Sequence, residues 1–214
     1  MPQQIVQLVY PALVLFFVLF ALIVSDRAFP LRVRRMFYLM LLTSLILVLM
    51  DGSSGWLAGQ GFLSGRAGVG TLVVTMKYML RPLILMFWIQ VILRNCEKRL
   101  FLVVCLPGVL NLLLCLINLK THWIFGFRED GTLFWGPLIP LPFLVLAFYF
   151  VLMAVLVIWE ARKNDRTEIF LVFVILCTMV FASFMEFLRD YRVMLDHILG
   201  VGVCLYYFYL AIQA

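Results

Sequence analysis

Long apolar runs are the feature that most constrains this chain, because each is about as long as a helix that crosses a bilayer. A membrane-spanning helix needs about 20 mainly apolar residues. Seven such runs cover residues 5–24, 36–58, 71–93, 100–119, 138–159, 169–187 and 197–213. Of the 214 residues, 65% are hydrophobic and only 13% are charged, against about 25% charged in soluble domains. The sequence therefore predicts one all-α domain, a polytopic membrane bundle of about seven helices.

The segments that connect these runs differ in charge. Segments 25–35, 94–99 and 160–168 hold ten Lys and Arg residues, and the alternate segments hold five. Cytoplasmic loops of membrane proteins carry the excess of basic residues. This pattern predicts an amino terminus outside and a carboxyl terminus in the cytoplasm. The net charge of +6 then reflects membrane orientation, and we expect the lipid bilayer, not a nucleic acid, as the partner.

One of the outer segments, residues 120–137, is rich in aromatic side chains. Apolar residues alternate on both sides of a Glu129-Asp130-Gly131 turn. The alternating positions are Trp123, Phe125 and Phe127 before the turn and Leu133 and Trp135 after it. Strict alternation around an Asp-Gly turn is typical of a β-hairpin. We expect this hairpin either to close over the bundle as a lid or to anchor in the lipid headgroup region through its aromatic residues.

Charged residues inside the apolar runs need a partner or a task, because a lone charge is costly in the membrane. Lys77 and Arg81 are four residues apart and share one face of the third helix. Asp51, on the second helix, is expected at a similar depth. The economical arrangement is a pair of Asp51 with Lys77 or with Arg81, and Glu186 is a second candidate partner for Arg81.

Further polar residues lie on one face of the fourth helix and rise toward the aromatic segment. They are Asn111, Cys115, Asn118 and His122, at helical spacing. Together with the buried charges they predict an outward-facing cavity. Its expected lining is Asp51, Lys77, Arg81, Asn118, His122 and Glu186, and the lid over it contributes Trp123, Phe127 and Trp135. The cations suit a carboxylate or phosphate and the aromatics suit an apolar body. Alternatively, these groups join the helices through hydrogen bonds and salt bridges.

Motifs for catalysis are missing from the sequence. There are two histidines, no serine in a nucleophile elbow and no glycine-rich phosphate loop. Four of the five cysteines fall inside apolar runs, and none has metal-ligand spacing. We therefore expect no catalytic activity in this chain, no cofactor and no metal.

Several short motifs occur together in the aromatic segment and the last run. They are Trp123-Ile124-Phe125, Glu129-Asp130-Gly131, Gly136-Pro137-Leu138 and Tyr206-Tyr207-Phe208-Tyr209. In this pattern the chain resembles the N-terminal multi-pass membrane sensor region of bacterial GGDEF-type diguanylate cyclases, and similar regions precede some histidine kinases. No GGDEF motif is present, so the chain itself could not make a cyclic dinucleotide, although a longer parent protein could be a cyclase or a kinase.

The resemblance implies a sensory function in the inner membrane of a bacterium. A small extracellular or membrane-borne ligand, with an anionic group and an apolar body, would act through the last helix on a cytoplasmic output domain such as a diguanylate cyclase, as a homodimer. The alternative is a small transporter with an outward-facing polar cavity. A transporter is expected to show polar groups on both sides of the midplane and often two matching halves, and the sequence shows neither clearly.

Overall fold

The computed structural model describes residues 14, 16–23, 29–59, 67–93, 98–128, 132–161, 167–189 and 194–213. At some helix ends only the backbone is described, and this applies to residues 52–59, 67, 98–101, 160–161, 167–172, 186–189, 194 and 209–213. All statements below concern these parts of the chain.

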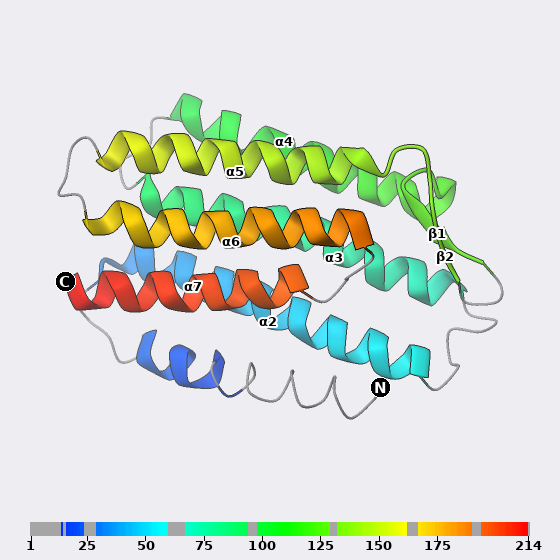
Figure 1. Cartoon of the computed structure of the whole chain (residues 1–214), viewed down its shortest axis with the longest axis horizontal. Helices are drawn as coiled ribbons and strands as arrows, with labels where there is room; N and C mark the ends of the chain where they lie inside the picture. Colours follow the sequence, from blue (N-terminus) through cyan, green and yellow to red (C-terminus); the bar gives the residue numbers. More distant parts are fainter. Residues whose placement is uncertain are drawn as a thin grey trace.

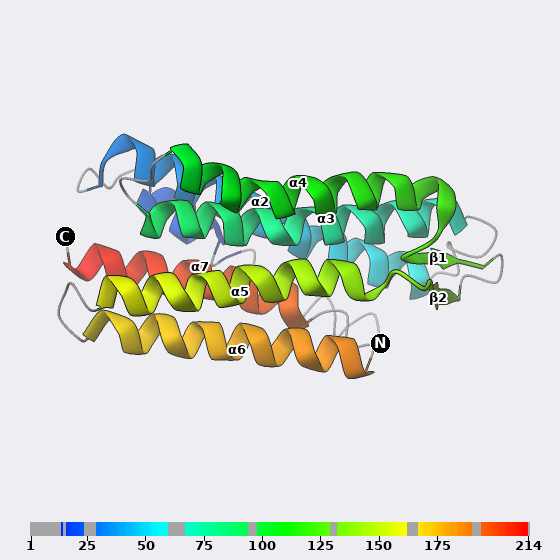
Figure 2. The same ribbon diagram turned by 90° about the horizontal axis from the view of Figure 1, so that it is seen from above.

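Helices lying side by side along one axis make up most of the described chain (Figures 1 and 2). Six have defined ends: α2 Leu31–Gly59, α3 Ala67–Ile92, α4 Lys98–Thr121, α5 Pro140–Ala161, α6 Thr167–Arg189 and α7 Met194–Gln213. Residues 16–23 are also helical. The predicted all-α bundle is therefore confirmed. Some helices extend well beyond the apolar runs, because polar residues at a helix end continue the backbone hydrogen bonding without adding apolar character.

Length and composition make four of these helices able to cross a membrane. The apolar stretches are Leu31–Asp51 in α2, Gly68–Ile92 in α3, Leu102–Thr121 in α4 and Pro140–Trp159 in α5. Helices α6 and α7 contain the shorter apolar stretches Phe173–Met185 and Leu195–Phe208. Large apolar side chains such as Phe17, Leu102 and Val151 are exposed on the outside of the bundle. An apolar exterior of this extent is a surface for lipid or for partners, and the seven crossings stay a prediction.

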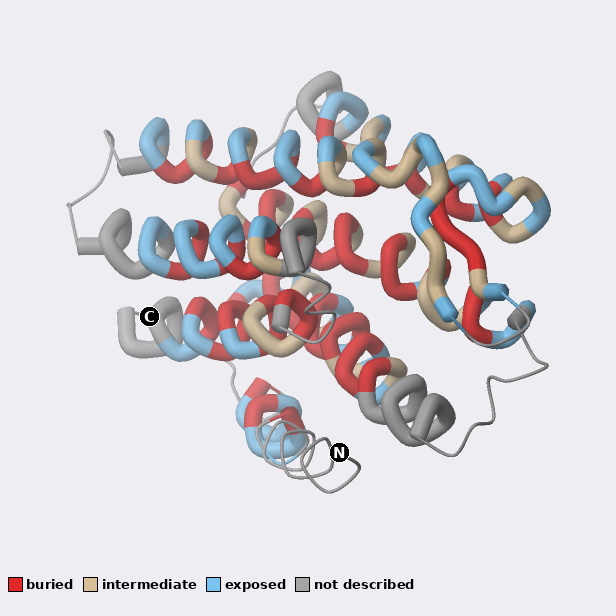
Figure 3. The backbone as a smooth tube through the Cα atoms, turned by 45° about the vertical axis from the view of Figure 1, so that its right-hand side comes forward, coloured by how far each residue is buried: buried red, intermediate tan, exposed pale blue. Residues whose placement is uncertain are grey.

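Helix α3 occupies the centre of the bundle. It contacts α2, α4, α5 and the first strand, whereas α7 packs between α2 and α6. Buried residues line the inward faces of the helices and much of α3 (Figure 3). Among the largest fully buried side chains are Trp88, Tyr149 and Phe37. The core therefore follows α3, and groups on α3 reach neighbours on several sides.

The aromatic segment between α4 and α5 forms the predicted hairpin. Strands β1, Phe125–Phe127, and β2, Leu133–Trp135, pair antiparallel with Phe125 opposite Trp135. The turn at 129–131 lies outside the described residues. The chain enters the hairpin at His122, whose φ of 52° ends α4 in the left-handed region. At its exit, Gly136 lies so close to the carbonyl group of Trp123 that a Cβ would collide with it.

Candidate functional site

Four charged side chains meet in the interior of the bundle where α2, α3 and α7 adjoin. Lys77 Nζ on α3 pairs with the carboxylate of Asp51 on α2 and lies 3.3 Å from Oδ2 of Asp196 on α7. Arg81 donates two hydrogen bonds to Asp196, from Nε to Oδ1 at 2.6 Å and from Nη2 to Oδ2 at 3.0 Å. We call Asp51, Lys77, Arg81 and Asp196 the charge cluster. Its two carboxylates balance its two cations.

Local structure explains why these groups converge. The four-residue spacing of Lys77 and Arg81 places both on one face of α3. Asp196 lies in the first turn of α7, where the helix dipole favours a carboxylate. Arg81 is fourteen residues from the start of α3, which corresponds to about 21 Å. The first turn of α7 therefore begins level with the middle of α3 (Figure 1), and the charge cluster lies deep in the bundle.

Burial makes the charge cluster sensitive to the loss of any member. Asp196 is 0% and Arg81 is 1% exposed, and Asp51 and Lys77 are also buried. Two further groups border the cluster: Nδ1 of His197 is 4.0 Å from Oδ2 of Asp51, and the Arg81 guanidinium lies 5.1 Å from the ring centroid of Tyr78. Removing one partner of a buried pair costs about 3–5 kcal/mol, because an uncompensated charge is left behind.

The sequence identified three of the four members and missed the fourth. The Asp51–Lys77 pair is as predicted. The carboxylate found on Arg81 is that of Asp196, and the side chain of Glu186 lies outside the described residues. Asp196 was missed because the seventh apolar run begins at His197, which left Asp196 in a connecting segment. The signal was present, because an acidic residue just before an apolar run is typical of a helix first turn.

The polar residues of α4 join this helix to the hairpin and to α3. The amide of Asn118 accepts from the backbone N–H of Ile124 at 2.7 Å and of Phe125 at 3.3 Å, and it donates to the carbonyl of Phe125 at 3.1 Å. Asn118 therefore positions β1. This agrees with the alternative prediction that the polar groups of α4 make structural hydrogen bonds. His122, at the end of the stripe, is exposed.

Asn111 has a particular task on the same stripe. In α3, Pro82 has no N–H, so the carbonyl of Tyr78 four residues earlier lacks its helical donor. The side chain of Asn111 donates to that carbonyl at 2.9 Å. The proline and the asparagine are thus one structural unit, and the hydrogen bond that α3 lacks comes from α4.

The hairpin aromatics divide into a buried and an exposed set. Phe125 is fully buried and its ring lies 5.3 Å from that of Tyr78, while Phe127 packs against Gly70. Trp123 and Trp135 are 54% and 42% exposed. The lid prediction required both tryptophans to fold inward over the predicted cavity, and at these exposures they do not. The reason is that β1 is the strand packed on α3, whereas Trp135 lies on β2 and Trp123 precedes β1.

Comparison of the chain with protein-family models, with curated proteins and with solved structures finds no match in any of the three. The function proposed below therefore rests on the sequence pattern and on the described geometry.

Proposed function

We propose that the chain is a membrane-embedded sensory module, of the kind that precedes diguanylate cyclases. It crosses a bacterial inner membrane seven times, with its amino terminus outside and its carboxyl terminus in the cytoplasm. A small extracellular or membrane-borne ligand changes the packing of α7, which passes the change to a cytoplasmic output domain in a homodimer. The observation that supports this most is the buried pair of Arg81 and Asp196, which attaches the start of α7 to the middle of α3.

The two ends of α7 are held by different contacts. At its start, Asp196 is bound to Arg81. Ten residues later, about 15 Å along the axis, the ring of Tyr206 lies 5.2 Å from that of Trp88, and the ring of Tyr207 lies 5.3 Å from that of Phe37. A helix moves largely as a rigid element, so a change at Asp196 reaches the aromatic contacts that precede the cytoplasmic end. Such a relay needs two packings with different affinity for the ligand.

Glycines let α7 pack closely against its neighbours. A Cβ on Gly202 would lie 2.6 Å from Cε of Met179 and 3.2 Å from the ring of Trp88. A Cβ on Gly200 would lie 2.8 Å from the ring of Phe16. Small residues that let helices approach closely are typical of helix contacts in membranes, which depend on van der Waals packing. These contacts carry no directional bond, which favours α7 as the element that shifts.

The transporter alternative is less well supported by the same geometry. Among the described side chains, the buried charges are Asp51, Lys77, Arg81 and Asp196, and they gather in one cluster and pair with one another. A transported anion would have to displace a carboxylate from Arg81 or Lys77. Transporters typically place polar groups near the midplane between two related halves, and a single balanced cluster at one three-helix junction does not follow that plan.

A fusion experiment tests the relay. The chain is joined after Ala214 to a diguanylate cyclase domain through an alanine helix, with one to four extra alanines inserted. Each insertion rotates the output domain by about 100° relative to α7. If α7 is the relay, cyclic-di-GMP production varies with insertion length with a period near 3.6 residues, and Asp196→Asn changes production at a fixed length. Production that depends on neither change would overturn the proposal, and ion or solute flux in proteoliposomes would then favour the transporter.

A further inference from the structure

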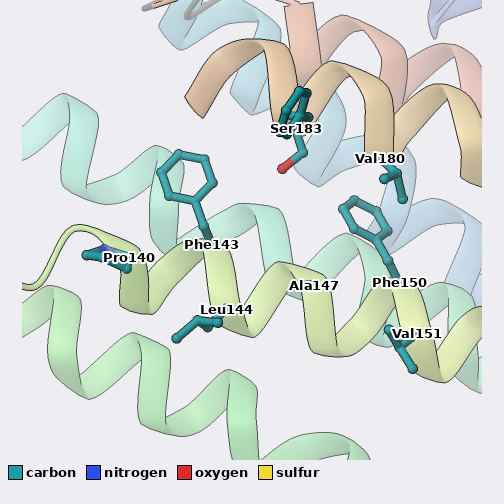
Figure 4. A pocket seen from close by; sticks show the side chains of 9 residues that line it. Pro140, Phe143, Leu144, Ala147, Phe150, Val151, Val180 and Ser183 are labelled. Carbon is teal, nitrogen blue, oxygen red and sulfur yellow. The ribbon is translucent and has the colours of Figure 1, made fainter. Parts of the chain in front are cut away.

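A cavity of about 390 Å³ lies on the outside of the bundle between α5 and α6. Its volume falls in the range of small-molecule sites, about 300–1,000 Å³. Its rim consists of side chains that are exposed on the apolar exterior, among them Leu144, Val151 and Phe184. In a membrane this cavity opens sideways into lipid. We call it the α5–α6 groove (Figure 4).

The spacing of one small and two large residues on α5 shapes the groove. Ala147 lies between Phe143 and Phe150 at helical spacing on α5, so the lining has a methyl group between two rings. The α5 lining runs from Pro140 to Val151, a length of about 16 Å. The groove is therefore elongated along the helices, as a chain-like molecule requires.

Ser183 is the polar residue of the lining. The residue is 9% exposed, and its hydroxyl points into the space between α5 and α6 near Phe143 (Figure 4). Some helical hydroxyls donate to the carbonyl four residues earlier, as Thr178 does to Val174 at 2.8 Å and Thr43 does to Leu39 at 2.6 Å. Those of Ser44 and Thr75 are buried without a partner. Within the described part of the chain, the Ser183 hydroxyl has no such partner. Ser183 lines the α5–α6 groove, where a ligand can supply the hydrogen-bond partner that its hydroxyl lacks.

We infer that the α5–α6 groove binds a single-chain lipid with an uncharged head, whose hydroxyl or carbonyl oxygen hydrogen-bonds to Ser183. The tail lies along α5 over Ala147 toward Val151. The occupant comes from the bilayer because the groove faces lipid. Its head carries no charge, because the described side chains that line the groove include no Lys, Arg, Asp or Glu, and a carboxylate or phosphate beside them would be buried without a counter-ion. Ser183 is six residues from the outer end of α6, about 9 Å, so the head lies at the outer end of the groove.

The other side of α6 provides the connection to the relay. Met179 and Ile175 are buried, and both meet α7 at Gly202. A lipid that fills the groove presses α6 toward α7 at this contact. This assignment of the lipid as the signal rests on the proposed sensory function, whereas its binding does not.

Photo-labelling of the full chain in liposomes tests the binding. The probe is hexadecanol carrying a diazirine near the middle of its chain, and labelled peptides are identified by mass spectrometry. Labelling is expected on residues 143–151 and 180–184. Ala147→Phe fills the groove and is expected to reduce labelling at least tenfold. Ser183→Ala removes one hydrogen bond and is expected to weaken labelling about fivefold.

Matched variants control for the added ring and for the lost hydroxyl. Val155→Phe adds a ring to the exposed face of α5 outside the groove, and Thr178→Ala removes a hydroxyl that already has a backbone partner; neither is expected to change labelling. Ala147→Leu provides a milder filling if Ala147→Phe does not fold. Labelling that is equal in wild type and both filled variants, or that a diazirine phospholipid reproduces at the same positions, would show ordinary surrounding lipid and overturn the inference.

A second measurement separates this inference from the proposed function. In the cyclase fusion, hexadecanol is expected to change cyclic-di-GMP production in wild type and not in Ala147→Phe. Specific labelling without a change in production would keep the binding site and overturn the lipid as the signal. A production change that survives in Ala147→Phe would overturn the α5–α6 groove as the site and leave the relay standing.

Discussion

The two sides of helix α3 are joined to their neighbours by different chemistry. Toward α2 and α7, Lys77 and Arg81 make buried ion pairs with carboxylates. Toward α4 and the hairpin, Tyr78 uses neutral contacts, since its carbonyl accepts from Asn111 and its ring packs on Phe125. One helix therefore has a charged side and a neutral side within a single turn.

This difference indicates which part of the bundle is fixed and which can shift. Neutral hydrogen bonds to backbone groups have a fixed geometry and do not depend on the charge of either partner. A buried ion pair holds only while both partners are charged and paired with each other. The α3–α4–hairpin side is therefore expected to act as a frame. The attachment of α7 is the contact that a local change of charge or packing can alter, as switching elements require.

The largest effect is expected from breaking the charged side. Arg81→Gln leaves Asp196 buried with less compensation, and we expect the free energy of unfolding to fall by about 3–5 kcal/mol, measured by denaturation in detergent micelles. Arg81→Gln with Asp196→Asn removes both charges and is expected to recover at least half of the loss. Arg128→Gln, at an exposed position, is the control and should change little. Strict additivity of the two single changes would show that Arg81 and Asp196 are not coupled.

A smaller effect is expected from crowding the frame at the hairpin exit. Gly136→Ala places a Cβ against the carbonyl of Trp123 and 2.8 Å from that of His122. Backbone cannot rotate out of the way as a side chain can, so we expect a loss of about 3 kcal/mol, at the upper end of overpacking costs. Gly68→Ala is the matched control, because a Cβ there meets nothing within 4 Å, and it should stabilise α3 slightly. An equal free energy of unfolding in the two variants would show that close packing at Gly136 does not stabilise the frame.

The hydrogen bond on the neutral side of α3 can be tested with a double-mutant cycle. Asn111→Leu leaves the Tyr78 carbonyl without the donor that replaces the missing N–H of Pro82, and the expected loss is about 1–2 kcal/mol. Pro82→Ala restores a backbone N–H at the position four residues after Tyr78. In the Pro82→Ala background, Asn111→Leu should therefore cost much less. An identical cost in both backgrounds would show that Asn111 acts by packing alone.

Most of the helices and the hairpin were predictable, because each leaves a local pattern in the sequence. Apolar runs mark the helices, and alternation around a turn marks the strands. The pairing of Arg81 with Asp196 joins residues 115 apart in the sequence, and no periodicity reports which distant helix lies beside α3. The same applies to Asn111, whose role depends on Pro82 in the neighbouring helix α3.

The exposure of the tryptophans was the part of the site least open to prediction. Alternation shows which residues share a face of the hairpin, but it does not show which strand packs on the bundle. Since β1 packs on α3, Phe125 is buried and Trp135, its partner on β2, is half-exposed. Both alternatives stated from the sequence were compatible with the pattern, and only the packing of β1 on α3 separates them.

The smallest effect is therefore expected from the exposed tryptophans. Trp123→Ala and Trp135→Ala should each change the free energy of unfolding by less than about 0.5 kcal/mol, as surface substitutions usually do. Phe125→Ala, a buried residue of the same hairpin, should lose about 3–5 kcal/mol. If the tryptophans lie at headgroup height, their fluorescence is quenched by a nitroxide on the lipid headgroup and little by one deep in the acyl chain. Each Trp→Phe variant should remove part of the headgroup-quenched signal. Deep quenching, or loss of output in the cyclase fusion with unchanged stability, would instead place the tryptophans in the signalling path and make the hairpin more than a frame.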